Sequence, residues 1–336
     1  MFTSGSAGDE RVVVRRERDG APVFELAGVS PAVSADGKRL AYWRTTPNVG
    51  ATDLRVLDVA DPRSDRSVMT VPDQTLGGSV VWSNDGQGLL VATHSRETVG
   101  GGGVESGGPA QYDLLLLDLT STPPGTRAAA APVTGGRVFV PVAWDRPAQI
   151  ASAVVTGPGG YATEYVTWNG TAASPFARAE VPRLALAFSV QASTDGKLVM
   201  MLEDNLTVLR VWPILDVTQA EQVRSASRIS LFPIWRPGPS APYEVIWGMG
   251  QKIDLFRYRT DQSTTLYTST GGLGLAAVRP DGSAVLVTEG SPTSATPPPA
   301  PPTYRVVVVD VATRQATEAA PLTGTVRVLS RGVLLR

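Results

Sequence analysis

The sequence repeats a short turn motif about every 50 residues, and this repeat constrains the fold more than any other feature. An Asp-Gly pair precedes an apolar stretch in residues 34–38, 83–87, 193–197 and 279–283. Asp-Gly between apolar runs is a strong hairpin signal, because tight turns need φ > 0 and Gly adopts it at little cost. Hairpins repeated at this period are typical of a β-propeller, so an all-β propeller is predicted.

Two further segments keep the strand but have lost part of the turn. Asp145 remains without its Gly in residues 142–147, and a Pro-Gly pair replaces Asp-Gly at Pro237. With these two, the repeat accounts for six turns. The C-terminal segment 326–335 lies one period further on and has the pattern of two strands.

The two ends of the chain supply complementary halves of one more blade. Residues 11–28 have the pattern of outer strands and residues 323–336 that of inner strands, and pairing them would remove free sheet edges. We therefore predict one domain, 1–336, as a seven-bladed β-propeller whose closing blade is split between the termini, with residues 1–10 flexible. The alternative is a six-bladed propeller with the end pieces outside the ring.

The composition excludes several classes of function. The 336 residues include 30 basic and 31 acidic side chains, which leaves no net basic character for a nucleic-acid partner. The absence of Cys removes disulfides, thiolate nucleophiles and zinc–thiolate sites. No stretch approaches the roughly 20 apolar residues of a membrane span. We expect a monomer with no cofactor, no bound metal, no nucleic acid and no membrane span.

The first residues leave the compartment open. They carry neither the basic start nor the apolar core of a signal peptide. The protein is therefore either cytoplasmic or the trimmed soluble part of an exported or anchored protein. The short polar segment before the strand at Arg11 favours the extracytoplasmic interpretation. A third interpretation is that the chain is one domain of a longer protein.

The repeat unit has the order Ser-x-Asp-Gly-Lys, an apolar strand, and a second strand that ends in Asp. This order resembles the TolB-type, WD-repeat-like β-propeller family, with Asp36, Asp85, Asp195 and Asp281 in the turns and Pro280 as the remaining copy of the family's turn proline. The family includes periplasmic scaffold proteins, lipoprotein ectodomains and propellers attached to peptidase domains. The resemblance therefore implies a bacterial cell-envelope protein, without choosing among these functions.

Two repeated residue types have structural interpretations. Asp58, Asp118 and Asp310 end apolar strands, where a carboxylate accepts backbone N–H bonds from the following turn. Three of the seven Trp residues stand at equivalent places just before the turns, which predicts packing between neighbouring blades rather than ligand stacking. These three are Trp82, Trp144 and Trp235.

Two long connections are predicted on the face opposite the Asp-Gly turns, in residues 96–111 and 290–303. Long insertions on a rigid scaffold often carry binding, although loops also accept insertions that have no role. The first is flexible because of its glycines, and the second is a stiff polyproline II segment. The candidate partner-binding residues are Gly100, Gly101, Gly102, Gly103, Pro297, Pro298, Pro299, Pro301 and Pro302.

No catalytic constellation stands out in the sequence. His94 is the only His, no Gly-x-Ser-x-Gly motif occurs, and no spacing brings Asp204 and Asp216 together. We therefore predict a non-enzymatic binding or scaffolding module that engages a protein or cell-envelope partner through the two long loops. The alternative is a carbohydrate- or ester-directed hydrolase or lyase with a carboxylate or metal site at the propeller axis.

Overall fold

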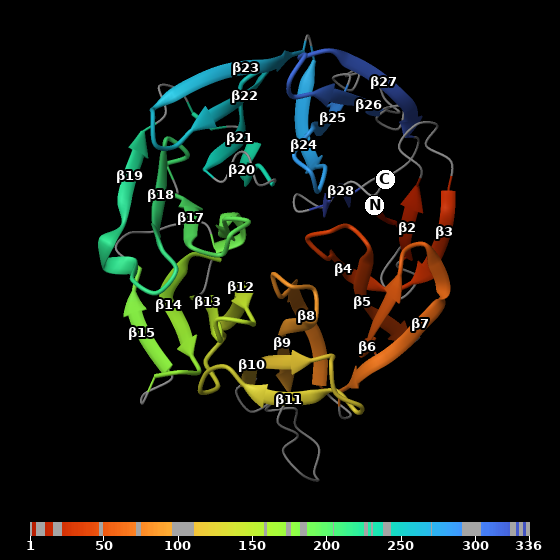
Figure 1. Ribbon diagram of the computed structural model, residues 1–336, viewed down its shortest axis with the longest axis vertical. Helices are drawn as coiled ribbons and strands as arrows, with labels where there is room; N and C mark the ends of the chain where they lie inside the picture. The colour runs from red at the N-terminus through yellow and green to blue at the C-terminus, as the bar shows by residue number, and fades with distance from the viewer. Residues whose placement is uncertain are drawn as a thin grey trace, which may run out of the picture.

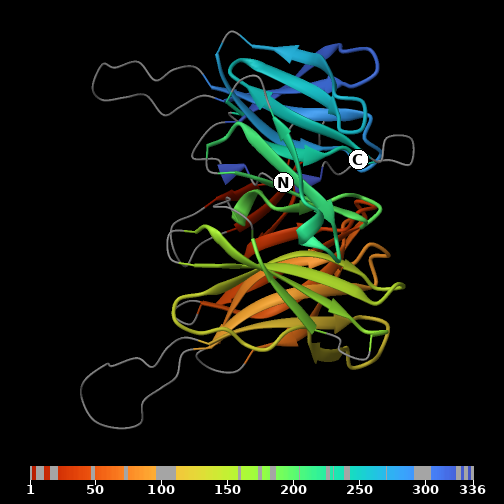
Figure 2. The same cartoon turned by 90° about the vertical axis from the view of Figure 1, so that its left-hand side faces the viewer.

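The computed structural model describes most of the chain as antiparallel sheets arranged around a ring, seen from above in Figure 1 and edge-on in Figure 2. The described residues are 2–4, 11–15, 22–46, 50–71, 75–95, 111–157, 160–172, 176–181, 187–203, 205–224, 228–229, 231–237, 243–269, 271–290, 304–322, 327–328 and 332–333.

Six blades within these ranges each use four consecutive strands, the first of them innermost in the ring. Blade 1 comprises β4 (Val29–Val33), β5 (Arg39–Thr46), β6 (Gly50–Asp58) and β7 (Asp61–Thr70). Blade 2 comprises β8 (Thr75–Trp82), β9 (Gly88–Ser95), β10 (Gln111–Asp118) and β11 (Gly125–Ala128). Blade 3 comprises β12 (Val138–Asp145), β13 (Ile150–Thr156), β14 (Ala162–Asn169) and β15 (Phe176–Glu180).

The other three blades follow in chain order. Blade 4 comprises β16 (Gln191–Ala192), β17 (Leu198–Leu202), β18 (Val208–Pro213) and β19 (Glu221–Arg224), with short 3₁₀ helices η1 (Ala187–Ser189) and η2 (Val217–Gln219) beside it. Blade 5 comprises β20 (Leu231–Trp235), β21 (Glu244–Met249), β22 (Lys252–Arg257) and β23 (Gln262–Thr268). Blade 6 comprises β24 (Gly272–Val278), β25 (Ala284–Gly290), β26 (Tyr304–Asp310) and β27 (Ala316–Leu322).

A closing sheet joins the two ends of the chain. Its strand order is β28 (Arg327–Val328), β1 (Phe2–Ser4), β2 (Arg11–Arg15) and β3 (Pro22–Ala27). It lies between blade 6 and blade 1 in Figure 1. Its buried Val12 and Val14 pack against an apolar cluster of blade 1, which consists of Leu40, Tyr42 and Leu57.

The predicted seven-bladed ring with a closing blade split between the termini is wrong. Six blades follow the repeat in the described residues, and the closing sheet does not have the predicted composition. Of the segment 323–336 only β28 enters it, while β29 (Gly332–Val333) runs parallel to β24 and extends blade 6. The predicted pair of inner C-terminal strands does not form, because β29 instead pairs with backbone groups at the inner edge of β24.

Residues 2–4, predicted to be flexible, form β1, which takes the second position of the closing sheet. Residues 11–28 contain β2 and β3, which pair antiparallel in the closing sheet. The six-bladed alternative describes the repeat blades. It places the chain ends outside the ring, however, whereas the closing sheet lies within it (Figure 1).

The Asp-Gly turns are built as predicted. At the first turn Ser34 Oγ donates to Asp36 Oδ1 at 2.6 Å and accepts the N–H of Arg39 at 2.9 Å. Gly37 has φ of 72°, a conformation that Gly adopts without strain. The same arrangement recurs at Asp85 and Asp195. The repeated Asp-Gly motif therefore forms turns, and these turns lie on one face of the ring.

Turns of neighbouring blades also touch one another. Arg39 donates from Nη1 to the carbonyl of Gly86 at 2.7 Å, and Arg236 donates from Nε to the carbonyl of Gly282 at 2.8 Å. Gly282 has φ of 69°, and a Cβ there would lie 1.9 Å from the carbonyl oxygen of Pro237. Gly282 is required both because the turn needs a positive φ and because the neighbouring blade leaves no room for a side chain.

The strand-ending carboxylates have the predicted role. Asp58 accepts the N–H of Ala60, Asp118 that of Thr120, and Asp310 that of Thr313, at distances of 2.7 to 2.9 Å. These bonds hold the turns between the third and fourth strands of three blades.

No helix in the described ranges has the length and apolar composition required to cross a membrane.

Candidate functional site

The two predicted binding loops fall almost entirely outside the described residues. Gly100 to Gly103 and Pro297 to Pro302 are among those not described, and only Gln111 and Gly290 at the loop ends are. The strands that bear the loops are described. Ser95 is the register partner of Gln111, and Gly290 that of Tyr304, so each loop leaves and re-enters at adjacent strand ends. Blades 2 and 6 lie on opposite sides of the ring, so the loops start far apart on this face (Figure 1).

Blade 2 has an aromatic pair at the base of its loop. The rings of His94 and Tyr112 stack with centroids 5.1 Å apart and an interplanar angle of 24°. Tyr112 also exchanges two backbone hydrogen bonds with Val133, which holds the start of β10 in place. His94 is therefore part of a packed strand pair.

Blade 6 has a polar network at the base of its loop. Glu289 accepts from Tyr267 Oη at 2.7 Å and pairs with Arg305 Nε at 2.9 Å. Burial raises the pKa of Glu289, but hydrogen bonds from Ser269 and Tyr267 and the charge of Arg305 outweigh it, so the net pKa is lowered. The carboxylate stays ionised and ties three strands together beneath the loop.

Of the two carboxylates considered for a joint site, Asp204 and Asp216, the structure describes only Asp216. Asp216 caps η2 by accepting the N–H of Thr218 at 3.0 Å. Each described carboxylate whose pKa is clearly displaced has it lowered, by turn hydrogen bonds or a nearby Arg; these are Asp36, Asp85, Asp118, Asp216, Glu289 and Asp310. In the described part of the chain no group of three or more His, Cys, Asp or Glu residues could hold a metal ion.

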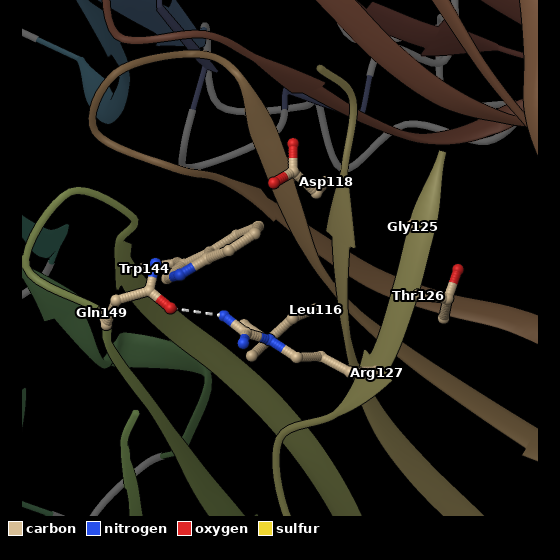
Figure 3. Close-up of a pocket in the computed structure, with 7 residues that line it drawn as sticks. All are labelled: Leu116, Asp118, Gly125, Thr126, Arg127, Trp144 and Gln149. Atoms are coloured by element: carbon tan, nitrogen blue, oxygen red, sulfur yellow. Dashed lines mark hydrogen bonds between the residues drawn. The ribbon is translucent and has the colours of Figure 1, made fainter. Parts of the chain in front are cut away.

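A pocket of about 310 Å³ lies between blades 2 and 3, at the strand ends that carry the Asp-Gly turns (Figure 3). Blade 2 contributes residues at the β10–β11 turn, and blade 3 contributes the end of β12 and the turn that follows. The lining residues are Leu116, Asp118, Gly125, Thr126, Arg127, Trp144 and Gln149. None of these was predicted as a site residue. The sequence signal that points there is the irregular repeat at residues 142–147, where the turn has lost its Gly.

Trp144 lines the pocket, although only 2% of its surface is exposed. Trp82 and Trp235, at equivalent places, donate from Nε1 to Ala32 and Gln191 on the inner strand of the preceding blade. Nε1 of Trp144 is buried and has no acceptor among the described residues. The prediction that these three tryptophans pack between blades is confirmed, and Trp144 differs in lining a pocket as well.

Arg127 forms the opposite wall of the pocket. Its guanidinium lies over the ring of Trp168, with Cζ 4.2 Å from the ring centroid. Its Nη2 donates to Gln149 Oε1 at 2.7 Å, as the dashed line in Figure 3 marks. Gln149 is itself held by a 2.6 Å bond from Nε2 to the carbonyl of Arg146. Within the described ranges no carboxylate forms an ion pair with Arg127.

Asp118 lies on the side of the pocket away from Arg127 (Figure 3). Its Oδ1 accepts from Thr120, and its Oδ2 lies 3.3 Å from Arg146 Nη1. Arg146 also bonds Asp85 from Nε at 2.8 Å, so it bridges the two blades. Hydrogen bonds from Thr120 outweigh burial, and together with the charge of Arg146 they lower the pKa of Asp118. The pocket thus has an anionic group at one end and a cationic group at the other.

Comparison with known proteins supports the fold only. No known family pattern matches the sequence, and no curated protein matches it significantly. A chain of the mitotic checkpoint complex aligns over 95% of this chain and 86% of its own length, at 15% identity and a TM-score of 0.56. Oligogalacturonate lyase from Vibrio parahaemolyticus aligns over 88% and 81%, at 11% identity and a TM-score of 0.56. The Cps50 (Swd1) β-propeller domain of Myceliophteria thermophila aligns over 94% and 92%, at 12% identity and a TM-score of 0.55.

Of the TolB-type, WD-repeat-like resemblance, the β-propeller fold is supported by the likeness to the Cps50 (Swd1) domain. TolB from Acinetobacter baumannii aligns over 91% of this chain and 58% of its own, at 12% identity and a TM-score of 0.43. This last likeness, with a TM-score below 0.5, adds nothing to the fold assignment, and the comparisons identify no particular protein. At such identities the likeness extends to the fold and not to the activity.

Proposed function

We propose that this chain is a non-enzymatic β-propeller module that binds a protein or cell-envelope partner through the face carrying the loops 96–111 and 290–303. The observation that carries the proposal is the unequal length of equivalent connections on that face. The second and third strands are joined by residues 203–207 in blade 4 and 250–251 in blade 5, but by residues 96–110 in blade 2 and 291–303 in blade 6. Long connections on a rigid scaffold are where binding residues are most often found.

The strands beneath both loops are well ordered by side-chain contacts. The His94–Tyr112 stack and the Glu289–Arg305 pair fix the strand ends from which the loops emerge. A binding loop gains affinity when its anchor points are held in place, because less conformational freedom is lost on association. A chain of a mitotic checkpoint complex shares the fold, which is consistent with a propeller that works inside an assembly.

The enzyme alternative, a carbohydrate- or ester-directed hydrolase or lyase at the axis, has less support. The lowered pKa values of the six displaced carboxylates suit turn and ion-pair roles, whereas a general acid needs a pKa raised towards neutrality. The likeness to oligogalacturonate lyase at 11% identity adds the fold and no catalytic residue.

The test uses the full chain with both long connections replaced by short turns. Partners captured from native extract by the unaltered protein are identified by mass spectrometry, and the affinity of the purified partner is then measured. Shortening both loops should abolish binding while leaving the melting temperature within a few degrees. Variants with a single shortened loop separate the two contributions. The control is Lys38→Glu with Lys197→Glu, at exposed positions on the opposite face. Undiminished affinity in the double-loop variant would refute the proposal.

A further inference from the structure

We propose that the pocket between blades 2 and 3 binds a carboxylate group, which Arg127 receives while the rest of the ligand occupies the pocket space that Trp144 lines. This inference concerns the face opposite the long loops and does not rest on their proposed role. The carboxylate has two possible sources with the same chemistry, an acidic side chain of a peptide segment or a small organic acid.

Arg127 is held ready to receive an anion. The stacking on Trp168 and the bond to Gln149 fix the plane of the guanidinium. Only one of its donors is used within the described residues, and a guanidinium carries five N–H groups in a planar arrangement that matches a carboxylate. Since the orientation is set by neighbouring side chains before binding, little side-chain entropy is lost when the anion arrives.

The apolar part of the pocket is shaped by the contact between Trp144 and Gly88. A Cβ on Gly88 would lie 2.2 Å from Cζ3 of Trp144, so the absence of a side chain lets the indole lie directly against β9. Leu116 adds a buried apolar side chain beside it. A volume of about 310 Å³ is at the lower end of the range for ligand pockets. It fits one side chain or a small ring rather than a polymer.

Asp118 restricts what the ligand can carry at its other end. Asp118 is paired with Arg146, whose Nη1 lies 3.3 Å from Oδ2, so this end of the pocket offers no unpaired cation to a second negative charge on the ligand. Phosphate monoesters, which carry nearly two charges at pH 7, are therefore disfavoured relative to a monocarboxylate. A neutral group or a hydrogen-bond donor suits this end of the pocket.

The experiment measures binding by the chemical shift of the Trp144 indole N–H in the full chain, assigned with a Trp144→Phe variant. The probes are benzoate, with benzamide as its neutral counterpart, and acetyl-Gly-Glu-Gly-amide, with the Gln peptide as its counterpart. Benzoate or the Glu peptide, or both, should shift the resonance in a saturable way at concentrations up to about 10 mM. Binding of the peptide but not benzoate indicates a partner segment, and the reverse indicates a small organic acid.

Two variants make the proposal falsifiable. Arg127→Gln should weaken binding about tenfold or more, because charge-assisted hydrogen bonds are lost. Arg63→Gln makes the same change at a side chain that is 93% exposed on blade 1 and should leave binding unchanged. Equal binding of the acids and their amides, no saturable binding of either acid, or unchanged affinity in Arg127→Gln would each overturn the proposal. Unchanged melting temperatures show that both variants are folded.

Discussion

Trp144 and Gly88 meet across the boundary between blades 3 and 2, with the indole so close to the backbone of β9 that no side chain fits at position 88. An ideal Cβ on Gly88 would lie 2.2 Å from Cζ3 and 2.7 Å from Cη2 of the indole. The contact joins two blades and shapes one wall of the pocket at their boundary.

The first prediction concerns that contact. Gly88→Ala should lower the free energy of unfolding by about 1–3 kcal/mol, because the ring must move out of a packed position. Gly125→Ala is the matched control, since its Cβ would have Ser121 Oγ as its nearest contact, at 3.4 Å. Urea denaturation of the two variants measures the difference. Equal stability of Gly88→Ala and Gly125→Ala would show that the indole is not confined as the structure indicates.

The second prediction separates backbone strain from crowding at the turns. Gly282 and Gly135 have φ of 69° and 71°, so alanine is strained at both by about 1–2 kcal/mol. A Cβ at Gly135 meets nothing within 4 Å, whereas at Gly282 it would lie 1.9 Å from Pro237 O. Gly282→Ala should therefore be the more destabilising by a further ~1–3 kcal/mol in thermal or urea unfolding. A difference near zero would mean that the turns of blades 5 and 6 are not in contact.

The third prediction concerns a buried ion pair in blade 4. Arg210 Nε lies 2.6 Å from Glu203 Oε1, and the two side chains are 6% and 4% exposed. Glu203→Gln leaves the Arg210 charge uncompensated and should cost about 3–5 kcal/mol. Adding Arg210→Met should recover much of this loss. Breaking the exposed Arg63–Asp61 pair with Asp61→Asn should change stability by less than ~1 kcal/mol.

The unfolding free energies of these three variants test the pair directly. A Glu203→Gln loss no larger than that of Asp61→Asn would contradict the burial of the pair. A double variant less stable than the single one would show instead that the charges contribute net stability.

The fourth prediction concerns the dependence of stability on pH. The charge of Arg146 helps to hold the pKa of both Asp118 and Asp85 below their ordinary value. A carboxyl with a lowered folded-state pKa contributes stability above its unfolded value near pH 4, and this is lost as the pH falls towards the folded value. Stability should therefore fall below about pH 4. Arg146→Met should reduce both the stability at pH 7 and the steepness of this acid loss.

Unfolding curves between pH 3 and pH 7 test this. If Arg146→Met and the unaltered protein lose stability in parallel across that range, the ties between blades 2 and 3 do not involve these ionised groups. The control is Arg63→Gln, at an exposed Arg of blade 1, which should leave the pH profile unchanged.

The repeat blades could be predicted because their signals are local. The bonds among Ser34, Asp36 and Gly37 span a few residues, so the turn can be recognised without the rest of the chain. The apolar strands that follow are equally local. The composition of the closing sheet could not be predicted in this way. Whether residues 332–333 pair within the closing sheet or with β24 depends on which backbone edge lies nearer after the ring has formed.

The two candidate sites differ in the same way. The face that carries the long loops follows from the alternation of strand direction, so residues 96–111 and 290–303 could be assigned to one face from the repeat alone. The pocket could not be assigned. Trp144, Arg127 and Gln149 carry no motif, and Arg127 meets Gln149 only because two blades are pressed together by packing. Turns and strands depend on neighbours in the sequence, whereas this pocket depends on how blade 2 and blade 3 meet.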